Sequence, residues 1–244
     1  MTRNLKGVFI DRLSLTDTGL SIGIIKRAIV HTHKVLDEID EKLVSVKVER
    51  ISQILELSNL SSMIGNILGA AIEDYSGGRF KRNEPHKYPD LLAQNKTGKD
   101  IEIKISLEKN HPKGHLPKEG FYLTFRYVLI DGYRPYDKNK RGQIAQIWEV
   151  RHGYLEGKHF NVSNTDGDSG KTAPINKIGM EALNVIYVDI EHCPYSERGR
   201  IYKKYVALIN KPSPMLNTPK KSKVKKSSTI LPSGTILKIK PTIK

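Results

Sequence analysis

Two carboxylates and an ammonium group lie in one short segment of this sequence, and together they suggest phosphate chemistry. Residues 88–106 read Y-P-D-L-L-A-Q-N-K-T-G-K-D-I-E-I-K-I-S and contain Asp90, Glu102 and Lys104. Carboxylate oxygens are the ligands that hard divalent cations prefer, and a lysine can stabilise negative charge that develops on a phosphate. If the three side chains converge, they would make a site for a divalent metal and a scissile phosphate.

A predicted hairpin would bring these three residues together. In residues 101–107, isoleucine or leucine alternates with polar residues, and period-2 alternation is typical of a strand. Glu102 and Lys104 would therefore share the face opposite the isoleucines. Residues 91–94 predict a short preceding strand, and residues 95–99 have hairpin-turn composition, so Asp90 would lie near the level of Glu102. The alternative is a solvated strand face with an ordinary Pro-Asp turn.

A helix is predicted immediately upstream, over residues 60–75. Its apolar residues Leu60, Ile64, Leu68 and Ile72 recur at helical spacing, with Asn59 as the expected N-cap and Gly77-Gly78 as the stop. Gly69 would permit a close backbone approach, and Glu73 falls near the carboxyl end. Glu73 is either a third acid near the metal or an ordinary surface carboxylate.

The order of these motifs resembles a known family. G-x-x-x-E (Gly69 to Glu73), then P-D (Pro89-Asp90), then E-x-K (Glu102 to Lys104) is similar to the PD-(D/E)XK nuclease superfamily, and within it to a type II restriction endonuclease. The resemblance covers residues 59–107. It implies an α/β (α+β) fold with a mixed central β-sheet flanked by helices, a restriction-endonuclease-like core with amino-terminal helices.

The resemblance also implies a mechanism and partners. Asp90 and Glu102 would hold Mg²⁺, which would activate water and neutralise charge on the phosphate. Lys104 would orient the attacking water or stabilise the transition state, and Glu73 would bind a second ion or orient a water. The substrate would be double-stranded DNA, cut sequence-specifically by a homodimer on a palindromic site, as in restriction-modification. No small-molecule cofactor is expected.

The rest of the chain supports the same fold class. Helical spacing is found over residues 21–43 and 46–57, strands are predicted at 121–130, 143–150 and 182–190, and residues 201–209 are ambiguous. Helices followed by strands favour an α/β or α+β domain. We expect one nuclease domain over 1–210, with 1–58 helical and available for dimerisation, the catalytic motif at 59–107, and the sheet and recognition loops at 121–190. A basic arm would follow at 211–244.

The charge is strongly positive and unevenly distributed. The formal net charge is +15, and residues 211–244 contain nine lysines and no acidic residue. Residues 1–210 keep 32 basic and 26 acidic residues, a net charge of +6. Such a balance favours a polyanionic partner, and the arm would attract phosphates without specificity or serve as a solubilising linker.

Two polar segments are candidates for reading the DNA, because arginine, asparagine and glutamine suit base edges while lysine suits phosphates. The first supplies Arg134, Lys138, Asn139, Lys140, Arg141 and Gln143, and the second supplies Ser169, Lys171, Thr172 and Asn176. The second segment loosely resembles a restriction-enzyme recognition loop. The alternative for both segments is a solvated surface loop.

Composition limits the remaining possibilities. No apolar run is long enough to span a membrane, and no secretory signal is evident after Met1, so we expect a cytoplasmic protein without a membrane partner. The single cysteine, Cys193, rules out an intrachain disulfide and a cysteine-rich zinc site. His111 and His115 have zinc-helix spacing, but the intervening Pro112 predicts a loop. Two other functions stay open: a structure-specific repair or junction nuclease, and a non-enzymatic basic DNA-binding protein.

Overall fold

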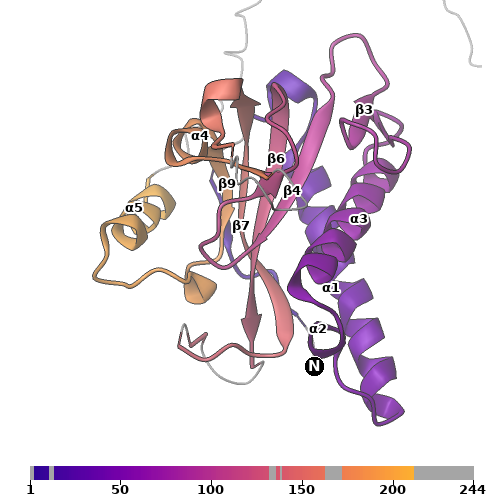
Figure 1. Cartoon of the computed structure of the whole chain (residues 1–244), viewed down its shortest axis with the longest axis vertical. Helices are drawn as coiled ribbons and strands as arrows, with labels where there is room; N and C mark the ends of the chain where they lie inside the picture. The colour runs from indigo at the N-terminus through magenta and orange to yellow at the C-terminus, as the bar shows by residue number, and fades with distance from the viewer. Residues whose placement is uncertain (1–2, 11–13, 132–135, 138, 163–171, 212–244) are drawn as a thin grey trace, which may run out of the picture. The chain divides into compact units, whose positions relative to one another are not determined.

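Seven strands form one mixed β-sheet in this computed structural model, in the order β1-β9-β7-β6-β4-β3-β2 (Figure 1). They are β1 (Val8–Phe9), β2 (Phe80–Arg82), β3 (Leu91–Ala93), β4 (Ile101–Leu107), β6 (Gly120–Ile130), β7 (Ile144–Leu155) and β9 (Asn184–Val188). β4 and β6 pair in parallel, whereas the other neighbours are antiparallel. A separate two-stranded ladder joins β5 (Lys113–Gly114) to β8 (Ala173–Pro174). The structure describes residues 3–10, 14–131, 136–137, 139–162 and 172–211.

Helices lie on both faces of this sheet (Figure 1). They are α1 (Ile22–Ser45), α2 (Ile51–Ile54), α3 (Leu57–Tyr75), α4 (Lys177–Ala182) and α5 (Arg200–Ile209), with short 3₁₀ turns η1 (Thr16–Thr18), η2 (Gly157–His159) and η3 (Ile190–His192). α1 and α3 pack with one face of the sheet in the main core, and α5 contributes to a second buried cluster on the other face. The predicted α/β (α+β) class, a mixed central sheet flanked by helices, is confirmed.

Helix α3 packs directly on strand β4. Its predicted apolar stripe is buried, including Leu60 and Ile72. A Cβ added at Gly65 would lie 3.2 Å from Ile105, whereas one added at Gly69 would meet its nearest atoms at 3.6 Å and beyond. The close approach that we expected at Gly69 is therefore found one turn earlier, at Gly65.

The ends of α3 agree only partly with the prediction. Gly77 and Gly78 adopt φ of 63° and 77° just after the helix, as the stop signal predicted. The helix begins at Leu57, however, and the residue in the N-cap position is Glu56. The Asn59 N-cap is therefore wrong, because the chain enters the helix three residues earlier than the apolar periodicity indicated.

The second predicted helix, over residues 46–57, is wrong for most of its length. Only the four residues of α2 are helical there. Lys47 takes a left-handed φ of 63°, which interrupts the helix, and a carboxylate oxygen of Asp40 accepts a hydrogen bond from the N–H of Ile51 at 3.0 Å.

Residues 1–58 are not wholly helical either, since they also contribute β1. The apolar face of α1, including Ile25 and Leu36, is buried in the core, whereas Val30 and Val44 of the same helix are exposed, and the role of residues 1–58 in dimerisation stays a prediction.

Residues 201–209, which the sequence left ambiguous, are helical and belong to α5. A buried ionic network joins this helix to the sheet. The hydroxyl of Tyr205 bonds to Glu149 and accepts from Arg126 at 2.9 Å, and Arg151 donates to Glu149 at 2.8 Å. Burial alone would raise the pKa of Glu149, but Arg126 and Arg151 outweigh it and lower that pKa to about 2. The network stays ionised at neutral pH and fixes α5.

The parallel pairing of β4 with β6 forces a crossover connection. β4 ends at Leu107 and β6 begins at Gly120, so residues 108–119 must return along the whole strand. We call these residues the strap. A helix is the usual solution for such a crossover, but here β5 is the regular structure within it. The strap therefore runs over the polar face of β4.

Candidate active site

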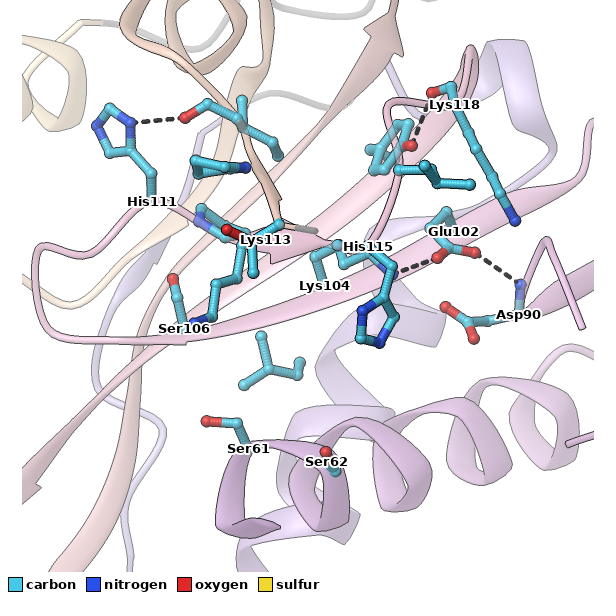
Figure 2. A pocket seen from close by; sticks show the side chains of 18 of the residues that line it. Ser61, Ser62, Asp90, Glu102, Lys104, Ser106, His111, Lys113, His115 and Lys118 are labelled. Atoms are coloured by element: carbon cyan, nitrogen blue, oxygen red, sulfur yellow. Dashed lines mark hydrogen bonds and ion pairs between the residues drawn. The ribbon is translucent and has the colours of Figure 1, made fainter. Parts of the chain in front are cut away.

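The β3–β4 hairpin brings Asp90, Glu102 and Lys104 together, as predicted (Figure 2). Leu91 pairs with Ile101, which sets Asp90 opposite Glu102. The N–H of Asp90 donates to Oε2 of Glu102 at 3.2 Å, and the N–H of Ile103 donates to Oδ2 of Asp90 at 2.7 Å. The Lys104 ammonium donates to Oε1 of Glu102. Both acids and the amine thus form one contiguous cluster.

The electrostatics of this cluster favour an added cation. Glu102 is only 8% exposed, and its burial raises the pKa of its carboxyl group. Lys104 lowers that pKa in part, while the neighbouring carboxylate of Asp90 raises it again. A positive charge placed between the two acids would relieve their repulsion, because opposite charges stabilise the ionised forms.

The donor set fits Mg²⁺. No group of three or more His, Cys, Asp or Glu side chains suited to a metal occurs in the described part of the chain, so the protein supplies two carboxylates at this point. Mg²⁺ characteristically keeps several waters and takes one or two carboxylates together with substrate phosphates. Asp90 and Glu102 would be its protein ligands.

The cluster opens into a cleft of about 930 Å³. Its walls come from the first turns of α3, the polar face of β4, the loop before β3, and the strap with β8. Figure 2 shows Ser61 and Ser62 of α3 on one side and the strap residues Lys113, His115 and Lys118 on the other. Residues of β4 from Glu102 to Leu107 line the cleft.

The lining is predominantly basic. Its charged or ionisable side chains are Lys87, Lys104, Lys113, Lys118, His86, His111 and His115 on the basic side, against Asp90 and Glu102 on the acidic side. The sequence interpretation missed Lys87, Lys113 and Lys118. A signal was present in residues 109–118, K-N-H-P-K-G-H-L-P-K, where a basic residue recurs at almost every second position. His111 and His115 lie in loop residues on either side of the short strand β5, as Pro112 predicted.

Glu73 is not brought to the cluster by any contact in the described residues. It is half-buried in the last turn of α3 and does not line the cleft. Its part in the metal site therefore stays a prediction, whereas Asp90, Glu102 and Lys104 share one wall.

The two predicted recognition segments are only partly described. Arg134, Lys138, Ser169 and Lys171 lie outside the described residues. Within the first segment, Lys140 pairs with Asp131 at 3.3 Å and Arg141 with Glu108 at 3.3 Å, while the N–H of Asn139 donates to Asp137 at 2.8 Å. The Gln143 carbonyl accepts from Ser52, and its side chain is exposed. The described residues Lys140 and Arg141 lie between the end of β6 and the start of β7, whereas Glu102 pairs with Tyr122 near the start of β6.

In the second segment, Thr172 lines the cleft. Asn176 has a structural role instead: its side-chain oxygen accepts from Gly179 at 2.9 Å and caps α4, and its amide nitrogen donates to the Lys158 carbonyl at 2.8 Å. Both ends of this amide are thus used within the protein, and no contact supports a role for Asn176 in reading a base.

No family model matches the chain, and a search of curated proteins finds no match. The geometry and chemistry of the site are therefore the basis for its function. None of the helices in the described ranges has the length and apolar character needed to cross a lipid bilayer.

Proposed function

We propose that the protein is a Mg²⁺-dependent endonuclease that hydrolyses phosphodiester bonds of double-stranded DNA. The observation that carries the proposal is the contact cluster of Asp90, Glu102 and Lys104 in a cleft with a basic lining. Acids that share a buried site with a lysine, beside the exposed lysines Lys113 and Lys118 that form no ion pair within the described residues, suit a polyanion and a cation together.

Each residue has a distinct task in this proposal. The carboxylates of Asp90 and Glu102 hold the ion, which, when bound, polarises the phosphate and favours ionisation of water. The ammonium of Lys104 lies beside Glu102, where it can orient the attacking water and offset charge that develops on the phosphate. Glu102 and Lys104 lie on β4 and Asp90 directly precedes β3, so the paired strands position the three groups before a substrate binds.

The motif order, the charge and the single thiol suggest the finer features of this proposal. A type II restriction endonuclease acting as a homodimer would match the motif order and the two-fold symmetry of a palindrome. The net charge of +15 supports a nucleic-acid partner. A cytoplasmic location suits the single thiol: Cys193 is buried, which raises its pKa to about 11 and keeps it unreactive.

The test is incubation of the purified full chain with supercoiled plasmid in Mg²⁺ or in EDTA. We expect Mg²⁺-dependent cleavage, lost in Asp90→Asn and in Glu102→Gln. Glu84→Gln is the matched control, because Glu84 is exposed just before the hairpin and does not line the cleft. Intact plasmid under every condition would reject the enzyme and leave a DNA-binding protein.

The pattern of products separates the two kinds of nuclease. Discrete fragments with reproducible ends indicate a short recognition sequence, whereas preference for a four-way junction or flap over linear duplex indicates structural specificity. Sequencing of the fragment ends would give the site and the cut position.

A further inference from the structure

The strap is the part of the cleft to which the sequence assigned no function. It carries Lys113, His115 and Lys118, whose side chains are exposed and line the cleft opposite α3. Neither Lys113 nor Lys118 forms an ion pair with an acid in the described residues, in contrast to Lys104. Two uncompensated ammonium groups therefore face the same space as the acidic cluster.

The strap is held at both ends, so the backbone that carries these charges is preorganised. At one end β5 pairs with β8, the N–H of Ile175 donates to the Pro112 carbonyl at 2.9 Å, and His111 bonds to the Ile175 carbonyl at 2.7 Å. At the other end the hydroxyl of Tyr88 donates to the Glu119 carbonyl at 2.7 Å, and that of Tyr122 to the Lys118 carbonyl at 2.7 Å. A wall fixed in this way loses little freedom when it binds a ligand.

The two lysines lie on either side of the acidic cluster. The Lys118 ammonium lies over the Tyr88 ring, 4.3 Å from its centroid, at the Asp90 end of the cleft. Figure 2 shows Lys113 extending toward Ser106, at the other end of β4. Between them, Gly114 comes so close to Lys104 that an added Cβ would lie 3.4 Å from its Cε. A polyanion that lies along β4 would therefore meet the ammonium groups of Lys118, Lys104 and Lys113 in turn.

From this arrangement we propose that the strap is the phosphate-binding wall of the cleft, where Lys113 and Lys118 bind phosphates of the DNA backbone on opposite sides of the scissile phosphate. The inference rests on the proposed function for its ligand, duplex DNA, but it concerns binding and not cleavage. Lysines that bind phosphates position a duplex without reading its sequence. They also release counterions, which makes affinity depend on salt.

The experiment measures that salt dependence in the absence of cleavage. Full-length Asp90→Asn protein in EDTA is titrated into a short fluorescent duplex at several NaCl concentrations, and binding is followed by anisotropy. Each phosphate contact contributes about 0.9 to the slope of log K against log salt. We expect Lys113→Met and Lys118→Met each to reduce the slope by about 0.9, and the double variant by about 1.8.

The controls isolate the strap from the rest of the positive charge. Lys96→Met with Lys99→Met removes two exposed lysines in the turn before β4, outside the cleft, and should leave the slope unchanged. Lys113→Arg and Lys118→Arg should keep the slope, because they keep the charge. Fluorescence of Trp148, the one tryptophan of the chain, verifies folding.

The outcomes test the phosphate-binding role of the strap separately from the nuclease activity. A reduced slope in the Met variants supports the strap even if no condition gives cleavage, in which case the nuclease proposal fails alone. An unchanged slope overturns the strap even if the wild type cuts DNA. Absence of duplex binding by the full chain, or an equal loss in the turn control, also overturns it.

Discussion

The side-chain carboxylates of Asp90 and Glu102 each accept a hydrogen bond from a backbone N–H at, or directly after, the other residue. The N–H of Asp90 donates to the Glu102 carboxylate at 3.2 Å, and the N–H that follows Glu102, on Ile103, donates to the Asp90 carboxylate at 2.7 Å. The register of the hairpin therefore also fixes the spacing of the two acids. A slip by one residue would turn Glu102 toward α3 and break both bonds, because successive strand side chains face opposite sides.

Lys104 should matter for the chemical step. We expect Lys104→Met to reduce the single-turnover rate of cleavage by about 10²–10³-fold, the usual effect of removing one electrostatic stabiliser of the transition state. Lys104→Arg should retain part of the rate. Lys99→Met, at the exposed turn of the same hairpin, is the control and should cut as the wild type does. A wild-type rate for Lys104→Met would remove this residue from the mechanism.

Glu102 should make the fold less stable as pH rises. Burial raises the pKa of Glu102 above its ordinary value of 4.5, so the folded state binds a proton more tightly than the unfolded state. Stability then declines as pH increases from about 4.5 through the raised pKa. The Tm of Glu102→Gln minus that of the wild type should therefore grow over this window in EDTA. A difference in Tm that does not change with pH would contradict the buried charge.

Added Mg²⁺ should stabilise the protein through the two acids. A ligand that binds only the folded state contributes about 2.7 kcal/mol at a concentration 100 times its Kd. We expect the Tm of the wild type to rise with Mg²⁺ concentration, and that of Asp90→Asn to stay constant. A calorimetric scan reports this without any DNA. Equal shifts in both proteins would place the ion elsewhere.

Glu149 should stabilise the fold, in contrast to Glu102. Glu149→Gln leaves Arg126 and Arg151 buried without their counter-charge, which costs about 3–5 kcal/mol. The lowered pKa of about 2 means that this stability is present above about 4.5 and is lost as pH falls toward 2. Urea unfolding followed by Trp148, with the Arg126 guanidinium 4.7 Å from its ring, measures the change. Glu191→Gln, which breaks an exposed pair with Lys6, should cost less than about 1 kcal/mol.

The two glycines of α3 should respond differently to alanine. At Gly69 a methyl group would make ordinary contacts, so Gly69→Ala should stabilise the helix by about 0.5–1 kcal/mol. At Gly65 the added Cβ would lie 3.2 Å from Ile105, and the crowding should offset the gain. Urea midpoints of the two variants test this, and a larger gain at Gly65 would contradict the packing of α3 on β4.

The sequence was sufficient for the parts of the site that depend on local periodicity. The alternation in β4 and the turn before it predicted the hairpin, and hence the contact of Asp90 with Glu102. Local patterns were less reliable where a tertiary contact decides the structure. The apolar spacing of residues 46–57 favoured a helix, but the carboxylate of Asp40 bonds to the chain at Ile51 and the backbone turns at Lys47.

The basic wall of the cleft could not be predicted from local sequence patterns. Lys113 and Lys118 face the acids only because β6 pairs in parallel with β4, and that pairing joins residues separated by a crossover. The same applies to Ser61, whose hydroxyl lies 3.1 Å from that of Tyr127, a partner 66 positions away. Such contacts follow from topology, which the hydrophobic pattern does not specify.

The connection between β4 and β6 has a consequence for how such a protein can diversify. Since parallel neighbours require a chain that travels back along the strand, the backbone of residues 108–119 cannot be deleted without losing the sheet. Its exposed side chains, by contrast, contribute little to the packing of the core. Substrate preference could therefore drift through substitutions in this one obligatory segment while the acids on the neighbouring hairpin stay where they are.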